Sequence, residues 1–252
     1  MLHSTRGIVF HSTKYAESSL IVKIYTGLFG LQSYLVKGVR NPKSKIKPGL
    51  FQPLTLLDLV VYHREKHSLQ SVKEIRLAHP YHSIPFDIRK SSLVLFINEL
   101  VYKVIREEET NPSLFEFLWG TCLRLDETDE PISSFHLFFA MHLCHHLGIF
   151  PHLNHSTSLQ IFNLREGHFQ SAVPEHPYYL NPENSQQFHA LLEVCSFDPY
   201  GPGEVARWRS GEISLRAEVR DQLLETILLY YQLHLPGFKG LQSHQILRTV
   251  LS

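Results

Sequence analysis

The spacing of the hydrophobic residues changes once along the chain, near residue 81. Between Arg6 and Ala78 the apolar residues come in short runs that partly alternate with polar ones, and from Phe86 onward they recur every three to four residues. Alternation places side chains on the two faces of a strand, whereas a period of 3.6 places them on one face of a helix. We therefore expect an α+β protein, with strands in its first part and helices in its second.

Five short runs rich in Val, Ile, Leu and Tyr predict five strands in the first part. Gly27 and Gly30 lie in the joint between the second and third runs, where glycine is free to adopt positive φ in a tight connection. Five short strands favour a closed barrel over an open sheet, because closure removes the exposed edges. An OB-fold over residues 1–80 is the expected barrel, and an SH3-like barrel is the alternative.

The second part of the chain predicts a mainly α-helical domain. Leu93, Phe96, Ile97 and Leu100 belong to one apolar stripe, which indicates a helix from Phe86 to about Glu108. Asn111 followed by Pro112 has the pattern of an N-cap and a first helical residue. The apolar segment that ends at Gly148 is typical of a buried central helix.

A polar, irregular stretch interrupts the helical pattern. Two strand-like pieces flank Arg165–Gly167 in this stretch and predict a small hairpin. The expected domains are therefore residues 1–80 for the barrel, 81–151 for the first helices of the helical domain, 152–182 for a hairpin-bearing insertion and 183–252 for the remaining helices.

The charges are segregated although the formal net charge of the chain is zero. Residues 1–80 contain 12 Lys and Arg against 4 Asp and Glu, so this part carries about +8, and the remainder carries about −8. Five of the basic residues fall in the short stretch 37–47, which the strand pattern places in a loop. A cationic loop on a small barrel with interleaved aromatic residues is typical of nucleic-acid binding, although many of those aromatics are expected in the core.

Signals for catalysis or metal binding are weak. The sequence has no P-loop, dinucleotide-binding, nucleophile-elbow or H-E-x-x-H motif, and its three cysteines are far apart. His142 and His146 have metal-ligand spacing on a helix, with His145, His152 and His155 nearby, but packed histidines account for the pattern more simply. Two acidic clusters, Glu107–Glu109 and Asp126–Glu130, are interpreted as solvated charge rather than Mg²⁺ ligands. No enzyme activity, cofactor or metal is expected.

The order of residues resembles the RecO family of bacterial recombination mediators. The opening pattern of that family is a Tyr, a Glu, a strand ending in Thr, a Gly, then Gly-x-Arg followed by Lys-Ser. The corresponding residues here are Tyr15, Glu17, Thr26, Gly30, Gly38, Arg40, Lys43 and Ser44. The resemblance continues through "HHLGIFPHL" and "YYQLHLPGFKGLQSHQIL", so it covers essentially the whole chain.

This resemblance implies a non-enzymatic role in recombinational repair after DNA damage. RecO-like proteins bind single- and double-stranded DNA, anneal complementary strands, contact the tail of single-stranded-DNA-binding protein, and assist RecR in loading RecA. Many members carry a four-cysteine zinc module after the buried helix, whereas residues 152–182 here contain no cysteine. The opening residues lack a signal-peptide pattern and no apolar run is long enough for a bilayer, so a cytoplasmic location without membrane contact is expected.

Two sets of site residues follow as hypotheses. The expected phosphate contacts are Arg6, Lys37, Arg40, Lys43, Lys45 and Lys47, with Tyr15 or Tyr34 as a stacking residue. The expected site for the acidic partner tail is an apolar notch with a cationic rim, formed by Arg216, Arg220, Leu224, Tyr231, Lys239 and Arg248.

Three alternatives to these readings stay open. The arginines of the tail site are as well placed to pair with neighbouring carboxylates. A second interpretation of the whole chain is an adaptor whose basic loop binds acidic protein tails. A metalloenzyme built on the histidine cluster is the remaining possibility.

Overall fold

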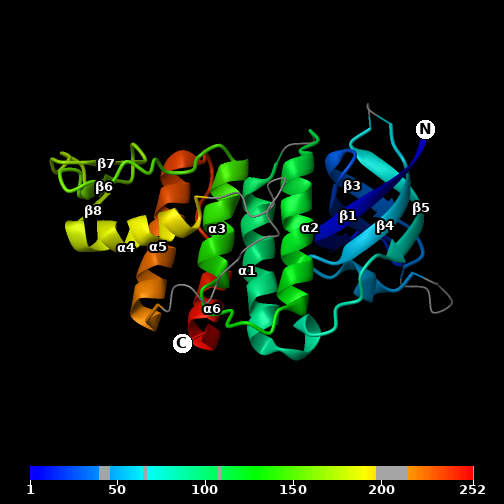
Figure 1. Cartoon of the computed structure of the whole chain (residues 1–252). Helices are drawn as coiled ribbons and strands as arrows, with labels where there is room; N and C mark the ends of the chain where they lie inside the picture. The colour runs from blue at the N-terminus through cyan, green and yellow to red at the C-terminus, as the bar shows by residue number, and fades with distance from the viewer. Residues whose placement is uncertain (40–45, 65–66, 107–108, 197–214, 252) are drawn as a thin grey trace. The chain divides into compact units, whose positions relative to one another are not determined.

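The structure is a computed structural model that describes residues 1–39, 46–64, 67–106, 109–196 and 215–251. The chain divides into two compact units, Met1–Thr128 and Asp129–Ser252. The first unit contains a β-barrel and two α-helices, and the second contains four α-helices and a small sheet within the described ranges (Figure 1). None of the described helices is long and apolar enough to cross a membrane.

Five strands form the barrel: β1 Leu2–Lys14, β2 Leu20–Thr26, β3 Gly30–Val36, β4 Leu56–Tyr62 and β5 Leu69–Leu77. They follow one another around it in the order β1-β2-β3-β5-β4, and the pairing of β1 with β4 closes the circle. β3 and β5 are parallel, whereas the other neighbours are antiparallel. This order is that of an OB-fold, so the predicted α+β class and barrel are confirmed.

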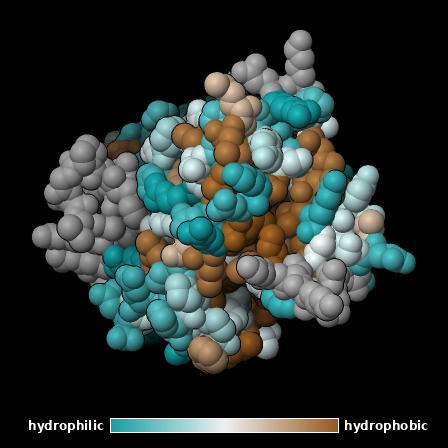
Figure 2. All heavy atoms as spheres, turned by 90° about the vertical axis from the view of Figure 1, so that its right-hand side faces the viewer, coloured by the Kyte–Doolittle hydropathy of each residue, from teal (hydrophilic) through white to brown (hydrophobic). Residues whose placement is uncertain are grey.

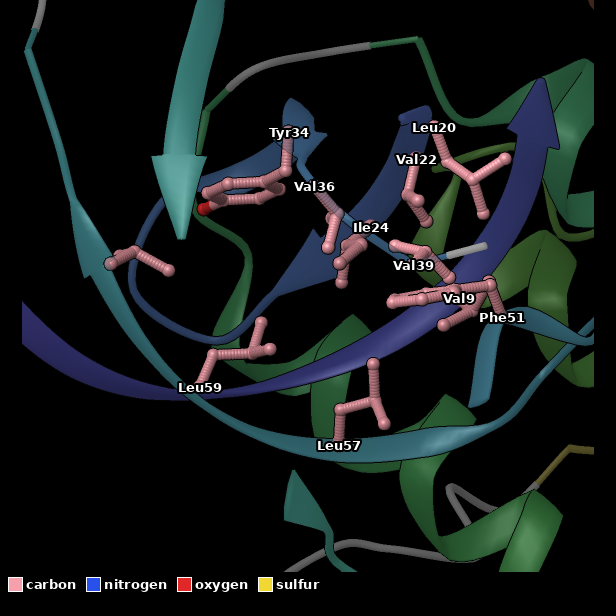
Figure 3. Close-up of a cluster of buried hydrophobic side chains, with 11 residues drawn as sticks. Val9, Leu20, Val22, Ile24, Tyr34, Val36, Val39, Phe51, Leu57 and Leu59 are labelled. Atoms are coloured by element: carbon pink, nitrogen blue, oxygen red, sulfur yellow. The ribbon is translucent and has the colours of Figure 1, made fainter. Parts of the chain in front are cut away.

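Alternation along the strands builds the barrel core. On β2 and β3, every second side chain is buried and the residues between them are mostly half-buried. The side chains that meet in the core include Val9 of β1, Val22 and Ile24 of β2, Tyr34 and Val36 of β3, and Leu57 and Leu59 of β4 (Figure 3). The register is fixed by this pattern, because a slip of one residue would turn the inward set toward solvent.

The joint between β2 and β3 uses its two glycines differently. Gly30 has a φ of +60°, as the sequence predicts. Gly27 has no positive φ, but a Cβ there would lie 3.4 Å from the ring of Phe115. That distance is an ordinary van der Waals contact, and the predicted positive φ is found at Gly30 and not at Gly27.

Two helices complete the first unit. α1 Ile88–Val104 begins after Asp87, whose side chain accepts a hydrogen bond from the backbone N–H of Arg89, so the helix is shorter than predicted at both ends. α2 Pro112–Glu127 begins as predicted, with the Asn111 side chain accepting from the N–H of Leu114. These helices belong to the compact unit of the barrel, whereas the hydrophobic period groups them with the later helices.

Asp126, near the end of α2, anchors the segment that leaves the barrel. Its carboxylate accepts hydrogen bonds from the backbone N–H groups of His82, Ser83 and Ile84 at 2.9 to 3.1 Å. The interpretation of Asp126 as solvated charge is therefore wrong, because its side chain is only 1% exposed. The buried ammonium of Lys90 lies beside it and donates to the carbonyl oxygens of Asp126 and Thr128.

The second unit is mainly helical. Its elements are α3 Phe135–His146, β6 Ile161–Asn163, β7 His168–Gln170, β8 Tyr179–Leu180, α4 Pro182–Val194, α5 Ala217–His234 and α6 Ser243–Leu251. Every residue from Phe135 to Cys144 is buried, which confirms the predicted buried helix. The helix ends before Gly148, whose φ is +69°.

The predicted hairpin is present in the insertion as β6 and β7. Asn163 holds the turn, because its side-chain oxygen accepts hydrogen bonds from the N–H groups of Arg165 and Glu166. Asn154 pairs with both backbone groups of Phe169 at 2.8 Å, as a further strand would. Hydrogen bonds of this kind organise the segment in which the family pattern has cysteines.

Candidate nucleic-acid interface

Strand register brings several predicted DNA contacts to one end of the barrel. Lys14 pairs with Leu20 in the β1–β2 ladder, and Leu20 pairs with Val36 in the β2–β3 ladder. The turn after Lys14 and the residue after Val36 are therefore neighbours. Pro48 lines the same hollow as Lys14 and Leu20, which places the end of the basic loop there as well. We call this region the loop end and define it by Lys14, Tyr15, Lys37 and Lys47.

The loop end presents cations and one aromatic ring to solvent. Lys14, Lys37 and Lys47 are exposed, and Tyr15 is 61% exposed. The N–H of Tyr15 donates to the carbonyl of Ser19 at 3.1 Å, which holds the turn. The other predicted loop contacts, Arg40, Lys43 and Lys45, lie outside the described residues. Lys14 was not among the predicted contacts, because nothing in its local sequence shows that it neighbours the loop.

The short 3₁₀ helix Pro48–Phe51 returns the loop to the barrel. Pro48 occupies its first turn, and the N–H of Leu50 donates to the carbonyl of Lys47 at 3.1 Å. Phe51 is 3% exposed and belongs to the barrel core. Burial of this ring fixes the position at which the basic loop ends.

The prediction of Tyr34 as a stacking residue is wrong. Its side chain has no exposed surface and lies in the barrel core among Ile24 and Val36 (Figure 3). Burial raises the pKa of Tyr34 well above its ordinary value of 10, as expected for a phenol in an apolar environment. A ring enclosed in this way cannot meet a base, so Tyr15 is left as the predicted stacking residue.

Arg6 is not at the loop end. It precedes Lys14 by eight positions on β1, which corresponds to roughly 26 Å along an extended strand. Its guanidinium forms an ion pair with Glu116 of α2 and lies 5.2 Å from the ring centroid of Phe115 and 4.9 Å from that of Trp119. Arg6 therefore has partners within the protein that a phosphate would have to displace.

The groove around Arg6 is rich in carboxylates. It has a volume of about 650 Å³, and its charged lining residues are Arg6, Arg76, Asp58, Glu74 and Glu116. Register places Asp58 between the two arginines, opposite Arg6 on one side and Arg76 on the other. Three carboxylates oppose a phosphate backbone, so we leave Arg6 out of the proposed DNA surface.

The barrel also exposes apolar side chains. Leu28, in the lining of the groove, is 50% exposed, and Tyr62 and Leu77 are 45% and 43% exposed. In Figure 2, hydrophobic side chains gather in the middle of the view and hydrophilic ones border them. Such a surface differs chemically from the cationic loop end.

Two residues of the predicted tail site are core residues. Leu224 is 1% exposed and Tyr231 is not exposed at all, and the Tyr231 hydroxyl donates to the carbonyl of Ala140 at 2.7 Å. The prediction that they form an apolar notch for a partner is wrong. The apolar stripe of α5 is instead used for packing inside the second unit, where α5 contacts α3. The buried residues of α5 are Leu223, Leu224, Thr226, Ile227, Leu228, Tyr230 and Tyr231.

The four basic residues of the predicted tail site have different environments. Arg220 donates to the carbonyl oxygens of Leu215 and Leu251, and so joins the start of α5 to the end of α6. Arg248 pairs with Glu225 at 2.5 Å and with Asp221 at 3.7 Å, which is the carboxylate pairing named as the alternative. Arg216 is exposed at the N-cap position of α5, and Lys239 is exposed beside a hollow.

That hollow lies against α5 and has a volume of about 480 Å³. Leu228, Leu229 and Leu241 contribute apolar surface to it. Its charged lining residues are Lys239 and Glu225, and Glu225 is paired with Arg248. An apolar hollow with a cation at its side has the chemistry expected for the tail site. The structure thus brings Lys239 together with apolar residues other than the predicted Leu224 and Tyr231.

The histidines after α3 are packed against the protein. His142 is 5% exposed, and burial, assisted by neighbouring His145 and His146, lowers its pKa from 6.5 to about 3. The Nε2 atom of His145 lies 2.9 Å from the carbonyl of Cys195, and its ring stacks on Phe150. Within the described ranges, no group of three His, Cys, Asp or Glu side chains is arranged to hold a metal.

The comparisons with known proteins cover the whole chain. The family model described as "Recombination protein O N terminal" matches residues 1–81, and the one described as "Recombination protein O C terminal" matches residues 85–242. A protein of Phocaeicola vulgatus named "DNA repair protein RecO" is 33% identical over 252 residues, which is 100% of both chains. Proteins of the same name from Flavobacterium psychrophilum and Bacteroides fragilis are each 35% identical, over 98% and 99% of both chains.

Proposed function

Because the chain belongs to the RecO family of DNA repair proteins, we propose that the loop end of its barrel binds DNA phosphates and promotes annealing of complementary strands. The observation that carries the proposal is the gathering of exposed Lys14, Lys37 and Lys47 at one end of an OB-fold. Lysines bind phosphates without sequence preference, which suits a protein that acts on any damaged region.

Annealing requires no catalytic group. Two complementary strands repel each other through their phosphates, and a cationic surface lowers that repulsion. Base edges stay available for pairing, because contacts to the phosphates leave them uncovered. The exposed ring of Tyr15 supplies a face for stacking beside these cations.

We further propose that the protein acts with RecR to assist loading of RecA, and that it binds the acidic tail of single-stranded-DNA-binding protein. The hollow beside Lys239 supports the tail proposal, since an acidic peptide that ends in an apolar residue needs an apolar notch and a cation.

Replacement of Lys43, Lys45 and Lys47 by Ala tests the DNA proposal. Log affinity for single-stranded DNA falls linearly with log salt by roughly 0.7 per phosphate contacted, so the triple variant is expected to flatten the slope by about two units. Fluorescence anisotropy with a labelled oligonucleotide, measured over a salt series, gives the slope. The rate of annealing of two complementary oligonucleotides should fall in parallel.

A charge-matched control removes three exposed cations that are not part of the barrel, Arg89, Arg165 and Arg216. This variant has the same net charge, and its salt slope should stay close to that of the natural chain. Equal slopes for the natural chain and the loop variant would exclude Lys43, Lys45 and Lys47 from the DNA surface.

Charge reversal at Lys239 tests the tail proposal. Lys239→Glu is expected to weaken binding of a synthetic acidic tail peptide by roughly tenfold, because it places a like charge beside the hollow. Arg216→Glu is the matched control, since Arg216 is exposed but does not line the hollow. Isothermal titration calorimetry with the full chain measures the affinity of each variant for the peptide. Loss of peptide binding in the Arg216 variant alone would place the site at the start of α5 instead.

A further inference from the structure

A second hollow adjoins the loop end and has a volume of about 400 Å³. Leu20 and Phe51 form buried apolar surface in it, and Pro48 and Pro53 line it from the segment between β3 and β4. Lys14 lines it from the end of β1. Apolar surfaces next to a cation are suited to a nucleotide, because its base is an aromatic ring and its phosphate is an anion.

Asn98 of α1 is one of the polar residues that line this hollow. Its Oδ1 atom is buried and has no hydrogen-bond partner among the residues that the structure describes. A buried acceptor without a partner costs free energy, so a ligand that donates to it would bind favourably. The carboxamide offers an acceptor beside a donor, and every nucleobase has a donor beside an acceptor on its pairing edge.

The electrostatics of the hollow also favour a nucleotide. No Asp or Glu is among the described residues that line it, whereas three carboxylates line the groove around Arg6. His11, in the lining, stacks on Tyr102 at 5.2 Å, and the ammonium of Lys23 lies 5.3 Å from the same ring. Lys14 and Lys23 therefore supply positive charge near this hollow.

The hollow is preformed by backbone contacts. Leu54 has a φ of +57°, and its N–H donates to the carbonyl of Val9 at 2.7 Å. The N–H of Thr55 donates to the carbonyl of Gln52 at 3.2 Å. This tight turn holds Gln52 and Pro53 against β1, so a ligand meets surfaces that are already in place.

We propose that this hollow takes up one unstacked base of single-stranded DNA bound at the loop end, with Asn98 pairing to the edge of the base and Lys14 contacting its phosphate. The inference rests on the proposed DNA-binding function. Since the carboxamide suits the edge of each base, the site accepts any sequence. One anchored base leaves the rest of the strand free to anneal.

The test compares two oligonucleotides of equal length, one with bases and one built of abasic sites, by anisotropy with the full chain. The natural chain is expected to bind the strand with bases at least tenfold more tightly. Asn98→Leu should reduce this preference by about tenfold while binding to the abasic strand is unchanged. Gln52 is an exposed residue of the same lining, and Gln52→Ala should reduce the preference for the strand with bases by a smaller factor. Leu95 lies on α1 outside the lining of the hollow, and Leu95→Ala should leave this preference unchanged.

The melting temperature of Asn98→Leu is a second readout. Removal of an unpartnered buried polar group should leave it unchanged or raise it, whereas a lower value would show that Asn98 has a structural role and overturn the proposal. Equal affinity of the natural chain for the two oligonucleotides would also overturn the proposed base site, but it would leave the proposed DNA-binding function intact. Competition by free deoxyadenosine monophosphate as strong as that by the oligonucleotide would identify a site for free nucleotides instead.

Discussion

Asp126→Ala is expected to lower the free energy of unfolding of the protein by about 3–5 kcal/mol, because it leaves the backbone N–H groups of His82, Ser83 and Ile84 without their acceptor. The carboxylate accepts from three consecutive N–H groups and lies 3.2 Å from His79. Urea unfolding of the full chain, followed by fluorescence, measures the loss. Glu127→Gln, one residue away and exposed, is the control and should change stability little.

The same carboxylate is expected to make stability depend on pH in acid. Burial raises the pKa of Asp126, but the hydrogen bonds from His82, Ile84, Ser83 and His79 outweigh it and hold the pKa well below 3.8. A depressed pKa contributes stability that is fully present above the unfolded value and is lost as the pH falls through the folded value. Asp126→Asn should therefore show a weaker loss of stability below about pH 4 than the natural chain. Parallel pH profiles would contradict this account.

Tyr34→Ala is expected to destabilise the barrel by about 3–5 kcal/mol, since it removes a fully buried ring from the core. Tyr34→Phe keeps the ring and should cost less than about 1.5 kcal/mol, with DNA affinity unchanged. Urea unfolding and anisotropy on the same preparations separate the two effects.

Tyr15→Ala is the complementary variant. The ring of Tyr15 is 61% exposed in the natural chain. The free energy of unfolding of the variant should therefore change by less than about 0.5 kcal/mol, while its affinity for single-stranded DNA falls. Weaker DNA binding by Tyr34→Phe, with Tyr15→Ala unaffected, would reverse the assignment of the two rings.

Local patterns in the sequence were enough to predict the element types. Alternation in β2 and β3 and the helical stripe of α1 each reflect which side chains one element can bury, and that property depends on residues near in sequence. The start of α2 was predictable for the same reason, because Asn111 caps an N–H only three residues away. The family followed from the order of such motifs along the whole chain.

The tertiary structure alone decided which of the side chains that are chemically suited to contact DNA are exposed and unpaired enough to do so. Tyr15 and Tyr34 are the same residue type in adjacent segments, yet closure of the barrel buries one ring and exposes the other. Register placed Arg6 opposite Asp58, and helix packing brought it to Glu116, 110 positions later. Closure of the barrel and long-range pairing depend on where distant segments meet, so neighbouring residues in the sequence carry little signal for them. For this reason the basic loop was identified from the sequence, whereas Lys14, Asn98 and Asp126 were found only in the folded chain.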